Sequence, residues 1–171
     1  MPEVGPVKVN VRSFVEFFGE SSLPVAVDTY QRGFVWNLEK VTQLAEDLVS
    51  HEELGDEAPP YYMGSVLVHR SSVKGKRFII DGQQRLTALS ILYRQLIGSL
   101  PEGFTMTYSS RSARSIRSAA ETFQNIRKPG KEIFERIRFT IIEVDRVDLA
   151  FTFFDTQNNR GVPLHATDLL K

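Results

Sequence analysis

The residues best suited to chemistry form the run Asp81-Gly82-Gln83-Gln84-Arg85. This run follows the apolar, strand-like residues 77–80 and opens a strongly helical stretch, residues 86–97. A strand that enters a helix through a glycine presents free backbone N–H groups, which bind anions well. Arg85 would lie in the first helical turn, against the positive end of the helix dipole, and this is unfavourable unless an anion is bound nearby. The sequence therefore predicts a phosphate-binding joint.

A purely structural joint is the alternative. Asp81 can be the N-cap and Gln84 the third helical residue of a capping box, which needs no ligand. Asp28 and Asp81 both stand at predicted strand ends, and either carboxylate could instead hold a magnesium ion beside a phosphate. Capping and metal binding remain open for Asp81.

A second polar cluster lies in the aromatic segment 30–36. Gln31 and Arg32 could bond phosphate oxygens or base edges, while Tyr30 or Trp36 offers a stacking face. Alternatively, the aromatic side chains belong to the core and the polar pair to the surface.

Two further features, the run 158–161 and the arginines within 111–117, could belong to a binding site or have an ordinary structural role. The run 158–161 is predicted to be a turn, in which Asn159 and Arg160 could reach a ligand or simply end a helix. Arg111, Arg114 and Arg117 recur at every third position. They could form a basic stripe against a nucleic-acid backbone, or a solvated helix face.

Composition narrows the class of protein. With 42% hydrophobic and 25% charged residues, the chain is typical of a single globular domain. It has no cysteine, and its three histidines, at positions 51, 69 and 165, are far apart. We therefore expect no metal site built from protein side chains of these types. The absence of a signal sequence and of a long apolar run predicts a cytoplasmic protein without membrane contact.

Zero net charge conceals an asymmetry. Residues 1–60 hold four Lys/Arg and eleven Asp/Glu, a net charge of −7, whereas residues 61–171 hold seventeen and ten, a net charge of +7. A basic half of this kind is compatible with nucleotide or nucleic acid as a partner.

Hydrophobic periodicity and turn residues predict an α+β chain. Helices are expected at 7–18, 37–51, 86–97, 112–127 and 148–157, and strands at 23–27, 62–68, 76–80 and 138–144. Residues 167–171 begin a helix that has no room to finish, so the single domain 1–171 is expected to be cut from a longer protein.

Taken in order, several motifs resemble one known family, the N-terminal domain of GmrSD-type restriction proteins, also found in the phage-defence proteins BrxU and SspE. The motifs are Tyr30-Gln31-Arg32 with Trp36, Gly64-Ser65, Asp81-Gly82-Gln83-Gln84-Arg85-Leu86-Thr87, Asn159-Arg160-Gly161 with Pro163-Leu164, and Asp168-Leu169-Leu170-Lys171.

The resemblance implies a ParB/sulfiredoxin-like α+β fold, a small mixed sheet flanked by helices. It also implies a nucleoside triphosphatase coupled to recognition of modified DNA, such as phosphorothioate or modified-base DNA. Magnesium is the expected cofactor. A C-terminal HNH-type nuclease domain of the same protein is an expected partner, and no nuclease activity is expected in this part of the chain.

On this hypothesis, the phosphates lie against the N–H groups of Gly82 and Gln83, and Arg85 neutralises their charge. Gln83 or Gln84 orients the attacking water, and Asp81 caps the helix or positions magnesium. Neighbouring loops complete the nucleotide site with Gln31, Arg32, Asn159 and Arg160. DNA is contacted by Tyr30, Gln31, Arg111, Arg114 and Arg117.

Two alternatives share these residues. One is a DNA-binding module that reads a modified backbone or base and hydrolyses nothing. The other is a ParB-like switch that binds nucleotide and dimerises.

Overall fold

The centre of the molecule is a mixed five-stranded sheet. The computed structural model describes residues 7–19, 23–27 and 33–161, and their side chains as far as residue 156. The strand order is β1-β5-β3-β4-β2, with β1 (Val7–Ser13), β2 (Val25–Val27), β3 (Tyr61–Ser71), β4 (Lys76–Asp81) and β5 (Ile137–Val144). The pairs β1–β5 and β3–β4 are antiparallel, whereas β3–β5 and β2–β4 are parallel.

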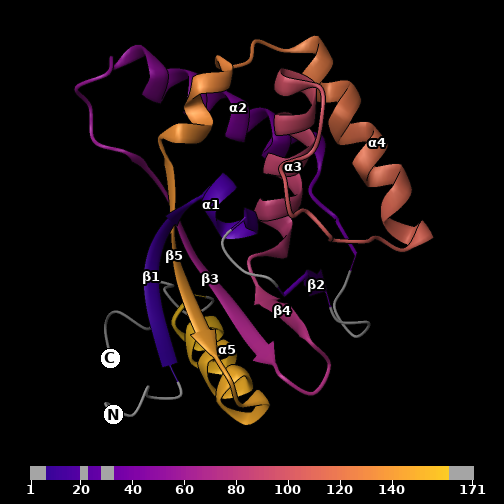
Figure 1. Ribbon diagram of the computed structural model, residues 1–171. Helices are drawn as coiled ribbons and strands as arrows, with labels where there is room; N and C mark the ends of the chain where they lie inside the picture. The colour runs from indigo at the N-terminus through magenta and orange to yellow at the C-terminus, as the bar shows by residue number, and fades with distance from the viewer. Residues whose placement is uncertain (1–6, 20–22, 28–32, 162–171) are drawn as a thin grey trace.

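Helices cover both faces of this sheet (Figure 1). One face packs against the helices α1 (Phe14–Gly19), α2 (Leu38–Glu53), α3 (Gln83–Ile97) and α4 (Ser110–Asn125), and the short 3₁₀ helix η1 (Lys131–Glu135). The other face packs against α5 (Val147–Gly161). Residues that alternate along β4 divide between the two cores: Ile79 packs with α3, and Phe78 and Ile80 pack with α5. The predicted α+β class and the small mixed sheet flanked by helices are confirmed.

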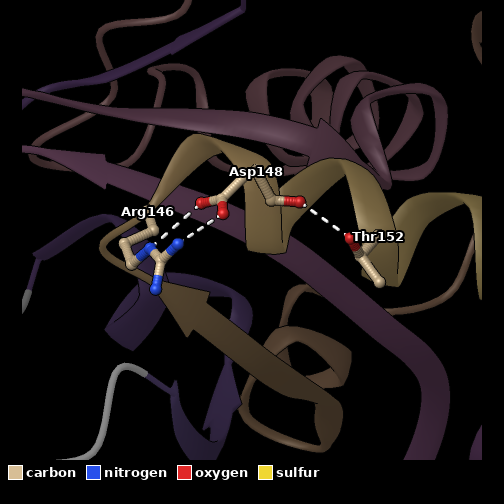
Figure 2. Close-up of polar contacts among 3 residues, drawn as sticks. All are labelled: Arg146, Asp148 and Thr152. Atoms are coloured by element: carbon tan, nitrogen blue, oxygen red, sulfur yellow. Dashed lines mark hydrogen bonds and ion pairs between the residues drawn. The ribbon is translucent and has the colours of Figure 1, made fainter.

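An exposed ion pair and a hydrogen bond lie at the start of α5 (Figure 2). Arg146 Nε and Nη2 donate to the two carboxylate oxygens of Asp148 at 3.1 and 2.5 Å, and Thr152 Oγ1 donates to the backbone carbonyl of Asp148 at 2.9 Å. The hydrogen bond from Arg146 is the main reason why the pKa of Asp148 is lowered. A carboxylate in the first turn also faces the positive end of the helix dipole.

Most elements lie where the sequence predicts them. Asn37 caps α2 as expected, its Oδ1 accepting from Lys40 N at 2.9 Å. The expected β3–β4 hairpin, α3, α4 and β5 are all present, each within a few residues of its predicted bounds. No helix in the described part of the chain is long and apolar enough to cross a membrane.

Two predictions about elements are wrong. Residues 7–13 form β1 rather than the first half of a helix. Val7, Val9 and Val11 alternate with polar residues, and this period of two, with β-branched side chains, suits a strand paired to β5. The predicted turn at 158–161 is also absent, because α5 continues through Gly161. Asn costs a helix at most about 0.7 kcal/mol per residue relative to Ala, so a helix that has already begun can continue through such residues.

Candidate functional site at the start of α3

The site is built where two neighbouring parallel strands end. β2 pairs in parallel with β4, with Val25 opposite Arg77 and Val27 opposite Ile79. Their carboxyl ends therefore lie at the same edge of the sheet. Asp81 ends β4, Gly82 follows, and α3 begins at Gln83. Ligands of open α/β sheets bind outside the carboxyl ends of the strands, so the motif occupies a favourable position.

Gly82 is the residue that turns the chain into α3. It is the N-cap, with φ 110° and ψ 0°, and its carbonyl accepts from Leu86 N at 3.1 Å. This left-handed conformation strongly favours glycine. A Cβ at this position would also lie 3.1 Å from Val66 Cγ2, so β3 leaves little room for a side chain.

The capping box predicted as the structural alternative is wrong. Among the residues that the structure describes, no side chain caps α3, and its first turn holds no acidic residue. Gly82 rather than Asp81 takes the N-cap position, because only glycine readily adopts the sharp left-handed turn between β4 and α3. Within the described residues, the partly buried Asp81 makes no side-chain hydrogen bond or ion pair.

Gln84 uses its side-chain amide to hold the segment that follows the second predicted motif. Its Oε1 accepts from Val35 N and its Nε2 donates to Gly33 O, both at 2.9 Å. These two hydrogen bonds have the donor and acceptor pattern that a neighbouring β-strand would provide. They bring residues 33–35 next to the start of α3, although the two segments are about fifty residues apart in sequence.

The same segment is held from its other side by α4. Phe34 N donates to Ser112 Oγ at 3.0 Å, and a Cβ at Gly33 would lie 2.5 Å from that oxygen. The close approach explains a glycine at position 33. Residues 33–35 are therefore fixed between the first turns of α3 and α4.

The two described aromatic residues of the 30–36 motif pack inward. Phe34 is fully buried in the core, and Trp36 packs against it with ring centroids 6.5 Å apart. For these two residues the core alternative of the sequence analysis is the correct one. Tyr30, Gln31 and Arg32 lie outside the described residues.

Arg85 binds the backbone of β3. Its Nη1 donates to Met63 O at 2.5 Å and its Nη2 to Ser65 O at 2.6 Å. Between these carbonyls lies Gly64, with φ 97°, where the register of β3 against β5 shifts. The guanidinium thus ties the irregular part of β3 to the first turn of α3.

Because Gly64 has no side chain, the Arg85 guanidinium has room to lie against it. A Cβ at Gly64 would lie 2.5 Å from Arg85 Nη1. Burial lowers the pKa of Arg85, while the nearby groups of Asp81 and Tyr62 act in the opposite direction. The side chain keeps its positive charge, because arginine is not deprotonated in proteins. The start of α3 therefore carries a fixed positive charge beside the N–H groups of its first turn.

The arginine stripe lies on α4, and all three side chains are exposed. Among the described residues, Arg111, Arg114 and Arg117 form no ion pair. Arg111 is adjacent to Ser112, which contacts the 33–35 segment. The arginine stripe therefore begins near the 33–35 segment and continues along α4 away from it.

As far as the structure describes them, Asn159 and Arg160 lie away from the start of α3. Both lie in the last turn of α5, whose described contacts are with the opposite face of the sheet from α3. Their side chains are beyond the described ones.

Ser112 and the carbonyls of Met63 and Ser65 are contacts that the sequence did not single out. A serine in an arginine-rich helix and two backbone carbonyls have no sequence signal of their own, because long-range contacts define them. A surface depression on α2 contains none of the predicted site residues and is lined by Asn37, Leu38, Glu39, Thr42, Gln43 and Glu46.

Comparison with known proteins shows the family to which the chain belongs. No curated protein matches the chain. One family model, described as the N-terminal domain of the GmrSD restriction endonuclease, matches residues 15–171. That range includes the α3 joint, the 33–35 segment, the irregular part of β3 and the α4 stripe. The chain therefore belongs to the GmrSD N-terminal domain family, a domain of restriction proteins.

Proposed function

We propose that this domain binds the phosphates of a nucleoside triphosphate at the start of α3 and hydrolyses it, in a defence protein that recognises modified DNA. One observation carries the proposal. The first turn of α3 begins at a left-handed glycine, with no side-chain cap and no acidic residue, at the carboxyl ends of two parallel strands. Backbone N–H groups and the helix dipole favour an anion at such a position.

The residues of the motif then divide their tasks. Phosphate oxygens accept from the N–H groups of the first turn, and Arg85 supplies positive charge from the side of β3. Two of its five N–H groups are used on carbonyls. Gln83 or Gln84 would orient the attacking water, and the side-chain amide of Gln84 also bonds the backbone of Gly33 and Val35.

Magnesium fits this arrangement through Asp81. Magnesium in nucleotide sites is usually held by one or two carboxylates together with phosphate oxygens and water. The Asp81 carboxylate stands at the end of β4 and is not used to cap α3. When bound, the ion neutralises charge that develops on the phosphates during transfer.

Recognition of DNA falls to residues around the 33–35 segment. Arg111, Arg114 and Arg117 would neutralise backbone phosphates along α4. Tyr30 and Gln31 would meet the modified group, and Arg32 would complete the nucleotide site. Segment 33–35 connects the proposed nucleotide site to the arginine stripe, because it contacts both α3 and α4.

The test places a negative charge where the phosphates are proposed to lie. Gln83→Glu puts a carboxylate in the first turn of α3, where the helix dipole favours it by about 0.3–1 kcal/mol. We expect nucleotide affinity and phosphate release to fall at least tenfold in the full-length protein with phosphorothioate DNA, in a variant that remains folded. Gln124→Glu, at an exposed position late in α4, is the control. Unchanged nucleotide affinity in Gln83→Glu would rule out this phosphate position.

A second function is favoured by the same contacts. The side chains of Gln84 and Arg85 make hydrogen bonds to the protein's own backbone, so they serve the fold, which is compatible with a binding module that hydrolyses nothing. In that case the start of α3 holds a DNA phosphate. DNA binding with a steep salt dependence and no nucleotide affinity would favour this module over the triphosphatase.

A further inference from the structure

The hairpin between β3 and β4 exposes an apolar side chain at its tip. Val73 is 96% exposed, the highest value among the large hydrophobic side chains that the structure describes as exposed. Figure 1 shows the hairpin loop projecting beyond the sheet, away from α2, α3 and α4. The described part of the chain therefore leaves this side chain uncovered.

The turn that presents Val73 is well formed. Lys74 N donates to the hydroxyl of the buried Ser71 at 3.1 Å, and Ser71 pairs with Lys76 across the hairpin. Gly75 takes φ 62° to close the turn. The exposure of Val73 is thus a property of a defined turn.

The surroundings of the tip are basic. Residues 69–80 contain no acidic residue, and Arg70, Lys74 and Lys76 are all exposed. Arg70 lies 3.7 Å from Glu143 on β5, and Lys74 Nζ lies 5.3 Å from the centre of the Phe78 ring. Lys76 forms no ion pair within the described residues. The tip thus combines one projecting apolar group with cations on both strands.

We propose that this hairpin tip is a contact for duplex DNA, with Lys74 and Lys76 on backbone phosphates and Val73 against the floor of the minor groove. Proteins that bind this groove combine Lys or Arg with an apolar side chain that meets the bases. A single valine buries too little apolar surface to hold a membrane, and lysine is depleted at protein–protein interfaces. Both alternatives fit the tip less well.

The contact is separate from the phosphate site at α3. The motif follows the carboxyl end of β4, whereas the hairpin lies at its amino end. Six strand residues place the two about 20 Å apart. The inference rests on the proposal that the domain binds DNA, but it requires nothing of nucleotide hydrolysis.

The experiment measures binding of the full chain to a fluorescent 20-base-pair duplex between 50 and 200 mM salt. Two phosphate contacts contribute about 1.8 to the slope of log affinity against log salt. We expect Lys74→Gln/Lys76→Gln to lower the slope by about this amount. Val73→Ser should weaken binding at least threefold at every salt concentration and leave the slope unchanged, because it removes no charge.

Matched controls come from exposed residues on other elements. Lys8→Gln/Lys131→Gln removes two exposed lysines outside the hairpin, and Leu54→Ser removes a side chain that is 68% exposed beyond α2. Both should bind as the parent does. Parent-like binding by the hairpin variants would overturn the hairpin contact alone. A parent that binds no duplex would overturn duplex DNA as the partner of the tip. Val73-dependent binding to anionic vesicles without DNA binding would assign the tip to a membrane instead.

Discussion

The side-chain amide of Gln84 lies 2.9 Å from the backbone nitrogen of Val35, and its other end lies 2.9 Å from Gly33 O. One side chain in the first turn of α3 therefore sets the position of the 33–35 segment. The contact joins the start of α3 and residues 33–35 into one structural unit, so a substitution in one segment should disturb the structure of the other.

Gln84→Leu should reveal the strength of that contact. It removes both hydrogen bonds and leaves one donor and one acceptor of the segment without their partner. Since water can reach part of the segment, we expect a loss of about 1–2 kcal/mol in the free energy of unfolding. Urea denaturation measures it. Gln124→Leu, on the exposed face of α4, should change stability by less than about 0.5 kcal/mol. Equal effects in the two variants would contradict the assigned role.

Arg85→Lys tests the double contact with β3. A lysine keeps the charge but cannot reproduce the planar fork that donates to Met63 O and Ser65 O together. We expect a loss of about 1–3 kcal/mol in stability. Arg94→Lys, exposed on the same helix, is the control. A stable Arg85→Lys protein with reduced nucleotide affinity would show instead that the arginine serves the ligand more than the fold.

Gly64→Ala combines backbone strain with a clash against Arg85, and Gly55→Ala measures the strain alone. At φ 97° any side chain is strained, and here the new Cβ would also meet Arg85 Nη1. Gly55, at φ 89°, has nothing within 4 Å of a built Cβ. Gly55→Ala should cost about 1 kcal/mol for the backbone alone, and Gly64→Ala should cost clearly more. Placing Gly64→Ala in an Arg85→Ala background should bring the two costs closer together, as a double-mutant cycle would measure.

The last prediction concerns pH. Tyr108 Oη lies 2.9 Å from the hydroxyl of Thr87 in α3, and burial raises the pKa of Tyr108 to about 12. The unfolded chain loses this proton near pH 10, before the folded protein does, so stability should fall as pH rises from about 10 to 12. Tyr108 as a whole residue is 36% exposed, so water screens part of the effect.

Urea denaturation of the parent and of Tyr108→Phe at pH 9 and pH 11 isolates that contribution. The variant should lose less stability between the two pH values than the parent loses. A Tyr108→Phe protein with an unchanged pH slope would show that the hydroxyl does not carry the effect.

Local sequence was sufficient for most of the secondary structure and for the location of the central motif. Asn37 signals the start of α2, and the apolar run before Gly82 with the helical run after it predicts the β4–α3 joint. Such features depend on neighbours in the chain. The strand β1 was misread because its short apolar pattern satisfies both helical and extended spacing until a partner strand is known.

What the sequence determined by itself is therefore the joint at residues 81–85, the basic run that becomes the exposed stripe of α4, and membership of an α+β restriction family. Tertiary structure alone decided what each side chain of the joint does. Gly82 displaced Asp81 from the cap, Gln84 reached Gly33 and Val35, and Arg85 reached the carbonyls of β3. The reason is physical: these partners are backbone groups twenty to fifty residues away, and a backbone carbonyl or N–H has no residue type by which the sequence could announce it.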